Sequence, residues 1–517
     1  MYQILVYIIT PILLLLLFWS FQLMRNWVQV RHIKGTSQFF FLPFRLPILC
    51  PNLSFAYWQA FIKATQQYGE EDGTLRVSFM ARNAIMITDR DLLKEYFVLK
   101  QSSFEKPKFI YSMFEIIGEN ILSAGTTEQW KRHQRVCAPA FSIDNLQFMS
   151  ETAVECTDLL RKEWDKKLAH KPSGIPLEGN DFTKITLEVL GRSGFGVSFG
   201  MFDTNDTKGH AFCHAIERII SHGMIICRLF EKDSVMYRLA VSVSGVSGAL
   251  QLANQVMTEL IEKRTREVQE AINDPNVMMD TDTKQDRRDI LSLLVKANVE
   301  EKLLTDMEIK SNALIFTAAG EETTSTTLQW IMYHLSKHVD VQKRAREEIS
   351  RVLPNGKRPS FDDYHKLEYV TAIIMETLRF NAPIMAAAKQ AKKNLTIGKY
   401  NIPKGTYVNA FIYGVHRCEK YYTNASVWDP SRWMDVEFRN GAQHDFSYIP
   451  FSMGLRKCIG FEFAKFEACM VLVRLLQFYE FTLLNREEEG DVMVEERGVT
   501  IRPGNLKVNI VPIVTEQ

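Results

Sequence analysis

The chain has 517 residues, a formal net charge of +1, 46% hydrophobic residues and 24% charged residues. This is the composition of a globular protein without an acidic or basic bias, so nucleic acid is not an expected partner. The eight cysteines are scattered and form no Cys-x-x-Cys pair, which argues against a zinc ribbon or a disulfide framework and indicates a reducing compartment. Because no repeat or low-complexity run follows about residue 60, we expect one large domain over residues 56–517.

An uncharged apolar segment opens the chain. Residues 4–24 contain no charged side chain, and about 20 apolar residues are enough to cross a bilayer. No basic residue precedes this segment, whereas Arg25 and Lys34 follow it, so the positive-inside rule places the downstream domain in the cytosol. We therefore predict a transmembrane anchor over residues 1–24, with a cleaved signal peptide as the alternative. Residues 25–55, which contain three prolines, are expected to be a linker.

The next patterns predict a small β region followed by helices. Residues 74–88 alternate between apolar and polar side chains and break at Ala81–Asn83, which is typical of a β-hairpin. Asp89 is a suitable N-cap for a helix that runs to about residue 98. Most of the remaining chain has helical spacing, so the fold class we expect is mainly α with a smaller β region (α+β).

A basic helix is predicted to begin at Trp130, in the sequence Trp-Lys-Arg-His-Gln-Arg. Gln134 lies four residues after Trp130 and therefore shares its helix face. Arg135 is turned about 100° from that face and reaches back to it only along its long side chain. The cations of this helix predict either an ordinary solvated face or a docking patch for an acidic electron donor.

A long helix is predicted to begin at the capping box Thr305-Asp306-Met307-Glu308 and to continue to about residue 338. A helix of that length measures roughly 45–50 Å and crosses a whole domain. Near its middle, Glu322 and Thr323 place an acid beside an alcohol, a pair that can deliver protons. Without other signals, such a pair within a helix is more often a surface feature.

Another acid and a base stand three residues apart at Glu376 and Arg379, on one face of a helix predicted over residues 367–380. A surface ion pair is the simplest interpretation. The helix is otherwise mostly apolar, however, so we expect the pair to be buried and to require further hydrogen bonds.

The segment 451–460, Phe-Ser-Met-Gly-Leu-Arg-Lys-Cys-Ile-Gly, precedes another predicted helix. Gly454 and Gly460 let the backbone bend tightly, so that its N–H groups can approach the Cys458 sulfur. The dipole of the following helix favours the thiolate form of this cysteine. Arg456 is suited to a bidentate bond with a carboxylate. A soft metal ligand beside a carboxylate clamp fits haem, which carries an iron and two propionates. The alternative is a buried cysteine behind a turn.

All fixed positions of the motif Phe-x-x-Gly-x-Arg-x-Cys-x-Gly are present, at Phe451, Gly454, Arg456, Cys458 and Gly460. The chain resembles the cytochrome P-450 haem-thiolate monooxygenases, of the membrane-anchored eukaryotic, fungal-like type. The resemblance implies the cytochrome P-450 fold, with a long central helix crossing the domain. It also implies haem b as cofactor.

Residue roles follow from the resemblance, position by position. Those it assigns are catalytic Glu322 and Thr323, haem-binding Trp130, Arg135, Lys389 and Arg456, the iron ligand Cys458, and a structural network of Glu376, Arg379 and Arg432. Two positions depart from the family pattern. Gln134 stands where the family usually has arginine, and Lys389 stands where it usually has arginine or histidine. Arg456 is therefore the surest expected contact to a haem propionate.

The resemblance also predicts activity, partners and location. The activity is insertion of one oxygen atom from O2 into a small lipophilic substrate, in secondary metabolism such as terpenoid or polyketide biosynthesis. Since the chain has no glycine-rich nucleotide fingerprint, electrons are expected from an NADPH-dependent flavoprotein reductase. The expected location is the endoplasmic reticulum membrane, with lipid contact through the anchor. The alternatives are a haem-thiolate isomerase or dehydratase that needs no external electrons, and a non-catalytic haem carrier or sensor.

Overall fold

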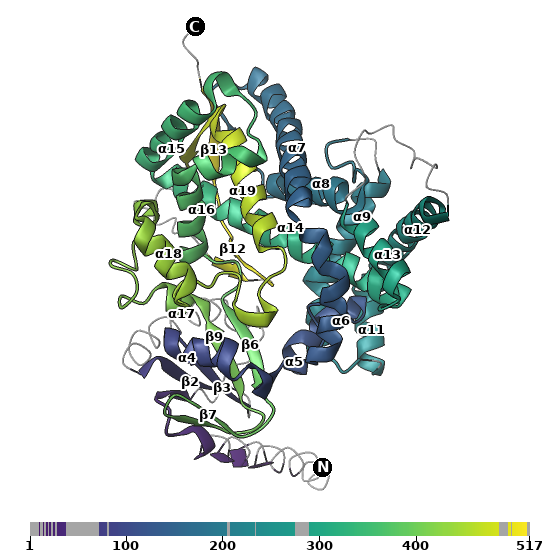
Figure 1. Cartoon of the computed structure of the whole chain (residues 1–517), viewed down its shortest axis with the longest axis vertical. Helices are drawn as coiled ribbons and strands as arrows, with labels where there is room; N and C mark the ends of the chain where they lie inside the picture. The colour runs from purple at the N-terminus through teal and green to yellow at the C-terminus, as the bar shows by residue number, and fades with distance from the viewer. Residues whose placement is uncertain are drawn as a thin grey trace, which may run out of the picture. The chain divides into compact units, whose positions relative to one another are not determined.

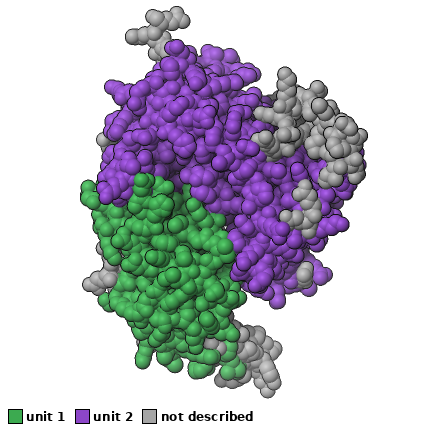
Figure 2. Space-filling model, viewed as in Figure 1, with its two compact units in different colours: residues 1–107, 385–427, 440–457 green, residues 108–384, 428–439, 458–517 purple. Residues whose placement is uncertain are grey.

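The computed structural model describes residues 28–517 apart from 38–71, 80–81, 204–206, 233, 274–288, 485–494, 498 and 514–517, together with a few single positions before residue 28. The chain divides into two compact units, which Figure 2 distinguishes by colour. Unit 1 comprises residues 1–107, 385–427 and 440–457, and unit 2 comprises residues 108–384, 428–439 and 458–517.

Helices dominate the described part of the chain (Figure 1). They are α4 (Arg90–Lys94), α5 (Lys108–Tyr111), α6 (Thr127–Cys137), α7 (Ile143–His170), α8 (Asp181–Val189), α9 (Thr207–Arg218), α10 (Met224–Leu229), α11 (Val235–Val243), α12 (Val246–Asn273), α13 (Ile290–Glu301), α14 (Asp306–Lys337), α15 (Val339–Val352), α16 (Glu368–Phe380), α17 (Ile412–His416), α18 (Val436–His444) and α19 (Phe461–Leu476). Short turns of other helical types used below are η2 (Glu95–Leu99), η4 (Ser112–Ile117), η10 (Pro430–Met434) and η11 (Gly454–Arg456).

The strands form small sheets. They are β1 (Gly35–Ser37), β2 (Thr74–Phe79), β3 (Arg82–Ile87), β4 (Phe104–Glu105), β5 (Ile175–Pro176), β6 (Ala386–Ala391), β7 (Leu395–Ile397), β8 (Tyr400–Ile402), β9 (Tyr407–Phe411), β10 (Tyr479–Leu483), β11 (Glu495–Arg497), β12 (Ile501–Pro503) and β13 (Val508–Pro512). The expectation of a mainly helical protein with a smaller β region is therefore confirmed.

Unit 1 is built on a six-stranded sheet with the order β1-β2-β3-β9-β6-β4. The hairpin predicted from residues 74–88 is its centre, with β2 and β3 antiparallel and Thr74 opposite Ile87. Strands β9 and β6, which come from more than 300 residues further along the chain, extend the sheet through the pairs β3–β9 and β6–β9. Asp89 caps α4 as predicted, accepting hydrogen bonds from the backbone N–H groups of Asp91 and Leu92.

Unit 2 is organised around α14. Its predicted capping box is present, because the Thr305 side chain accepts from Glu308 N and the Glu308 side chain accepts from Thr305 N. The helix contacts α8, α12, α16 and α19, and α19 also packs along α7. At Gly320 a Cβ atom would lie 3.1 Å from Leu190 Cδ1, so glycine allows close packing at this point of the helix.

The predicted boundaries at residues 24 and 55 stay predictions, because most of residues 1–27 and all of residues 38–71 lie outside the described part of the chain. Among the residues that are described, no helix is both long and apolar enough to cross a bilayer.

Candidate functional site

The cysteine loop begins in unit 1, where η11 contains Gly454 and Arg456. Gly454 has a φ of +72°, and a Cβ atom there would lie 2.5 Å from the carbonyl oxygen of Phe97. Both the backbone conformation and the lack of space exclude a larger residue. The tight bend predicted at this glycine is therefore confirmed.

Cys458 itself belongs to unit 2 and lies three residues before α19 begins at Phe461. Among the cysteines that the structure describes, it alone is exposed; the others are buried or half-buried. Gly460 is the N-cap of α19 with a φ of −91°, which other residues adopt readily. The chain turns at Ile459 and Gly460 as predicted. A Cβ atom at Gly460 would make only an ordinary contact, 3.5 Å from Phe141 Cε1, so this turn does not itself require glycine.

The acid and the alcohol in the middle of α14 have different hydrogen-bond partners. The Glu322 Oε1 atom accepts a hydrogen bond from the Thr500 hydroxyl at 2.9 Å and lies 3.3 Å from the Thr500 backbone nitrogen. The Thr323 hydroxyl donates to the Ala319 carbonyl at 2.7 Å. Ala319 is exposed and Thr323 half-exposed, although Ala318 and Thr324 beside them are buried. One face of this core helix is thus left open at the alcohol.

A second carboxyl group, that of Glu321, adjoins the predicted pair. It accepts hydrogen bonds from Thr183 Oγ1 on α8 at 3.0 Å and from Ser325 Oγ at 3.3 Å. Burial and then the neighbouring Glu322 carboxylate raise the pKa of Glu321 to about 7. This side chain is therefore close to half-protonated at neutral pH, a property that the sequence did not reveal.

In unit 1, Lys389 on β6 is held by aromatic rings and a carbonyl group. Its Nζ atom donates to Tyr96 O at 3.2 Å and lies 4.3 Å, 5.0 Å and 5.9 Å from the ring centroids of Tyr96, Phe97 and Phe104. Aromatic faces attract an ammonium group and fix its position. The Nζ atom of Lys389, which is predicted to bind haem, is therefore held at a defined position in unit 1.

Two further cations of unit 1, Arg456 and Lys106, interact electrostatically with Lys389. Burial and the charge of Arg456 lower the pKa of Lys389 to about 7. Burial, followed by the charges of Arg456 and Lys389, lowers the pKa of Lys106 well below its usual value. Three basic side chains are thus near enough to disfavour one another's charge, and an added anion would relieve that repulsion.

The predicted residues of α6 differ in exposure. Trp130 is 7% exposed, Gln134 is half-buried and Arg135 is exposed on the solvent side of the helix. The helix begins at Thr127, three residues before the predicted start, because Thr126 and Gln129 form a capping box.

The network of Glu376, Arg379 and Arg432 is assembled within unit 2. Arg379 donates to both carboxylate oxygens of Glu376, at 2.8 Å and 2.7 Å, and Arg432 Nε donates to Glu376 Oε1 at 3.1 Å. Asp429 N and Trp433 Nε1 add bonds of 2.8 Å and 2.9 Å. Glu376 and Arg379 are both 0% exposed, so a buried charge is fully paired and ties α16 to η10.

Comparison with known proteins decides the family. The family model described as "Cytochrome P450" matches residues 42–510. The chain belongs to the cytochrome P450 family. A P450 of Arabidopsis thaliana, "Cytochrome P450 709B1", is 29% identical over 85% of this chain and 81% of its own length. The human "Cytochrome P450 3A5" is 26% identical over 85% of this chain and 84% of its own length.

Solved structures have the same fold. The "cytochrome P450DA heme domain" has a TM-score of 0.73 at 25% identity and covers 89% of this chain and 94% of its own. The P450 fold expected from the cysteine loop is therefore confirmed. The chain is an oxidoreductase, a haem-thiolate monooxygenase in the general sense of this family.

The side chains of this P450 fit the haem group of the family. Cys458 is an exposed thiol just ahead of the N-terminus of α19, where the helix dipole favours the thiolate. Lys106, Lys389 and Arg456 form a group of cations suited to two propionates. The open face at Ala319 and Thr323 gives α14 a surface that a planar group can approach.

Sequence reasoning missed Lys106, Glu321 and Thr500. The sequence carries no signal for Lys106 or Thr500, because each meets its partners only through long-range folding. Glu321 was visible beside Glu322, but adjacent acids do not reveal which one will be buried.

We predict that Glu376→Gln lowers the free energy of unfolding by about 3–5 kcal/mol, because it leaves the buried Arg379 charge without its partner. Chemical denaturation followed by tryptophan fluorescence measures this change. Glu368→Gln, in the exposed first turn of α16, is the matched control and should shift stability only slightly. A Glu376→Gln protein as stable as the control would show that the network is not required.

We predict that haem retention falls as pH rises above about 7 and that Lys389→Arg flattens this profile. Since the pKa of Lys389 before haem binds is lowered to about 7, the amine must take up a proton above that pH before it can pair with a propionate. The dissociation constant of haem, measured by titration from about pH 6 to about pH 9, should rise by up to tenfold per pH unit above about pH 7 in the wild type. Lys393→Arg, at an exposed position, is the control; equal slopes in all three proteins would contradict the assignment.

Proposed function

We propose that this P450 hydroxylates, or oxidises in a related way, a small lipophilic substrate, with electrons from an NADPH-dependent flavoprotein reductase. The observation that carries the proposal is the alcohol Thr323 on the open face of α14, next in sequence to the acid Glu322, in a chain whose Cys458 thiol is exposed just ahead of the α19 N-terminus. An isomerase or a haem carrier has no need of such a proton-delivering pair.

The proposed roles follow from the chemistry of each side chain. Cys458 binds the iron as a thiolate, and bound haem then supplies oxygen activation, which thiolate donation promotes. Arg456, Lys389 and Trp130 hold the propionates. Arg135 contacts them only by extending the aliphatic part of its long side chain. The Thr323 hydroxyl passes protons toward the oxygen site.

Glu322 is the proposed source of those protons, and its Oε1 atom is held in place by the hydrogen bond that it accepts from the Thr500 hydroxyl at 2.9 Å. Glu321 stands one residue away with its pKa raised to about 7, so it can exchange protons at neutral pH. The remaining predicted residues, Glu376, Arg379 and Arg432, act by keeping the fold of unit 2 and take no part in chemistry.

The proposed location is the endoplasmic reticulum membrane, with residues 1–24 as an anchor and the rest in the cytosol. A second feature supports lipid contact. Helix α11 has exposed apolar side chains at Val235, Met236, Leu239 and Val243, which are 83%, 54%, 55% and 80% exposed. An apolar helix surface of this kind suits the interface of a bilayer.

The reductase is proposed to dock on cations that include Lys131 and Arg135, both exposed on α6. A basic patch steers an acidic partner and speeds its association at low ionic strength. Arg132 is less suited to this role, because it forms an ion pair with Glu308.

One experiment separates the candidate activities. Membranes that contain the expressed chain are supplied with NADPH and a purified flavoprotein reductase, and substrate-dependent O2 uptake is measured over a panel of lipophilic compounds. Monooxygenase turnover requires both additions. Turnover that is indifferent to NADPH would identify an isomerase or dehydratase, and haem binding without turnover would identify a carrier or sensor.

The substrate is proposed to be a terpenoid or polyketide intermediate of secondary metabolism. This rests on the fungal-like sequence Trp-Lys-Arg-His followed by Ala-Pro-Ala-Phe. Co-expression with the genes that neighbour this one, followed by product profiling, tests it directly. Oxidation of unrelated lipids in that experiment would contradict the proposal.

We predict that Cys458→Ser abolishes the shifted Soret band of the reduced carbon monoxide complex, because a serine hydroxyl does not supply thiolate donation. The difference spectrum of the reduced protein measures this band. Cys227→Ser, which alters a half-buried cysteine on α10, should keep it. Retention of the band in the Cys458 variant would remove this residue as the ligand.

We predict that Thr323→Ala lowers the product formed per NADPH by about tenfold or more, with the lost electrons recovered as hydrogen peroxide. Peroxide and product are quantified in the same reaction. The control is Thr327→Ala: Thr327 makes the same type of bond, to Thr323 O at 2.8 Å, but is only 6% exposed. Tight coupling in the Thr323 variant would exclude the proton role.

A further inference from the structure

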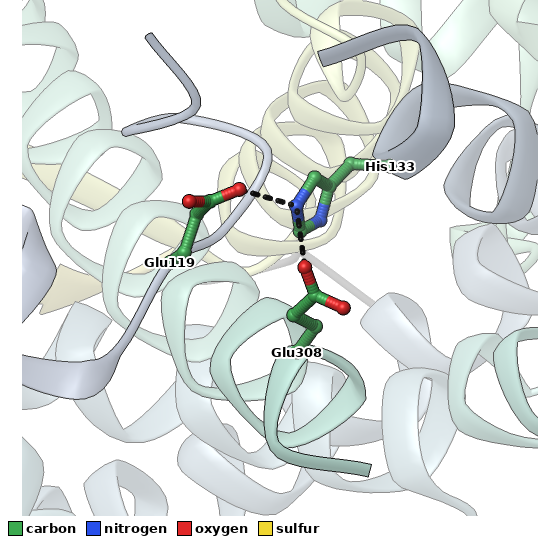
Figure 3. A group of neighbouring side chains, drawn as sticks. All are labelled: Glu119, His133 and Glu308. Atoms are coloured by element: carbon green, nitrogen blue, oxygen red, sulfur yellow. Dashed lines mark ion pairs between the residues drawn. The ribbon is translucent and has the colours of Figure 1, made fainter. Parts of the chain in front are cut away.

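A fully buried histidine, His133 on α6, lies between two carboxylates in unit 2 (Figure 3). Its Nε2 atom is 3.5 Å from Glu119 Oε1, in the loop after η4, and 3.8 Å from Glu308 Oε1, in the first turn of α14. Nε2 makes no hydrogen bond within the described part of the chain. The opposite ring nitrogen, Nδ1, lies 2.8 Å from Asn312 Nδ2.

The orientation of Asn312 fixes the tautomer of His133. The Asn312 Oδ1 atom accepts from the backbone N–H of Ile121 at 2.8 Å, and its Nδ2 atom donates to Glu308 O at 2.8 Å. Turning the amide over would place like groups against each other at both contacts. Asn312 therefore donates its second N–H to Nδ1, which must be unprotonated, and the imidazole proton lies on Nε2.

This tautomer disfavours a metal ion, although Glu119, His133 and Glu308 have suitable atoms. A metal-binding histidine needs a lone pair on the ligating nitrogen and usually donates its other N–H to an oxygen. Here Nε2 carries the proton and Nδ1 accepts. The guanidinium of Arg132 also forms an ion pair with Glu308 and lies 3.7 Å from Glu119 Oε1, so a cation already occupies this position.

The same hydrogen bonds join three segments. Asn312 holds the loop of residues 118–124 through Ile121 and holds α6 through His133. Ser311 Oγ adds a bond to Ile117 O at 2.7 Å, just before the loop. Both segments are therefore fastened to the first two turns of α14.

We infer that His133 is a positioning residue that fastens α6 and the loop of residues 118–124 to α14 while its imidazole is neutral, and that protonation releases them. A proton on Nδ1 would face the N–H of Asn312, donor against donor. Asn312 must then turn away and give up its bonds to Ile121 N and Glu308 O. The consequence for haem rests on the proposed function, because α6 also carries Trp130.

The surroundings of His133 set the pH range in which α6 and the loop of residues 118–124 are released from α14. Burial is the largest influence and lowers the pKa of His133; Glu308 and Glu119 act to raise it, and Arg132 lowers it. A histidine whose pKa is lowered by folding contributes its full stability above its unfolded value, near 6.5. That contribution is lost progressively as the pH falls below 6.5, so the fastening is complete at neutral pH and weakens in acid.

Hydrogen–deuterium exchange of the haem-loaded full chain tests the inference, at about pH 7.5 and about pH 5.5 with correction for intrinsic exchange rates. In the wild type, the equilibrium constant for opening of residues 118–124 should increase by up to tenfold for each pH unit below about 6.5. His133→Asn keeps an acceptor in place of Nδ1 but cannot be protonated, so its opening should not depend on pH. His170→Asn, which alters an exposed histidine, should behave as the wild type.

An acid-dependent opening of equal size in His133→Asn, or none in the wild type, would overturn the inference. If His133→Asn does not fold, Asn312→Asp decides, because its carboxylate accepts a proton from Nδ1 and should keep the loop fastened in acid. Protection of residues 118–124 by added zinc at neutral pH, lost in Glu119→Gln, would establish a metal site instead. The Soret spectrum of the same samples reports haem separately, so failure to bind haem would contradict only the proposed function.

Discussion

The constraint on which this structure depends is that a charge removed from water must be paired. Glu376 shows the complete solution: its carboxylate, 0% exposed, receives bonds from two arginines, an indole and a backbone N–H. A buried pair of this kind adds little to stability by itself, but removing one partner is costly. It therefore fixes the position of η10 against α16, and its role is structural.

Two half-buried charged groups near the candidate site are paired less completely, and their pKa values are shifted. Lys389 has a carbonyl group and aromatic rings as neighbours, and its pKa is lowered to about 7. Glu321 has two hydroxyl groups, and its pKa is raised to about 7. Groups of this type can change charge at neutral pH when a ligand arrives, whereas the Glu376 network is fixed. The contrast separates residues that hold the fold from those suited to exchange protons.

The sequence predicted the elements whose causes are local. The β2–β3 hairpin, the Asp89 cap and the capping box of α14 each depend on residues within a few positions of one another, and all were confirmed. The cysteine loop was found because its spacing is distinctive. The partners of Glu322 and Lys389 could not be predicted, since Thr500 and Tyr96 lie 178 and 293 residues away in sequence. The sequence also could not tell that Gly454 needs glycine for its positive φ whereas Gly460 does not.

Helix α6 carries both Trp130, a predicted haem-binding residue, and His133, which attaches the helix to α14. Trp130 and His133 are three residues apart and both buried, so they share one face of the helix and that face is held by packing. His133 connects the helix to α14 through Asn312, while Gln134, in the position where the family usually has arginine, gives the helix no charge toward a propionate. A helix that lacks this electrostatic tie depends more on its other attachments. The hydrogen bond of the neutral His133 imidazole therefore contributes more to holding α6 in place than it would if residue 134 were arginine.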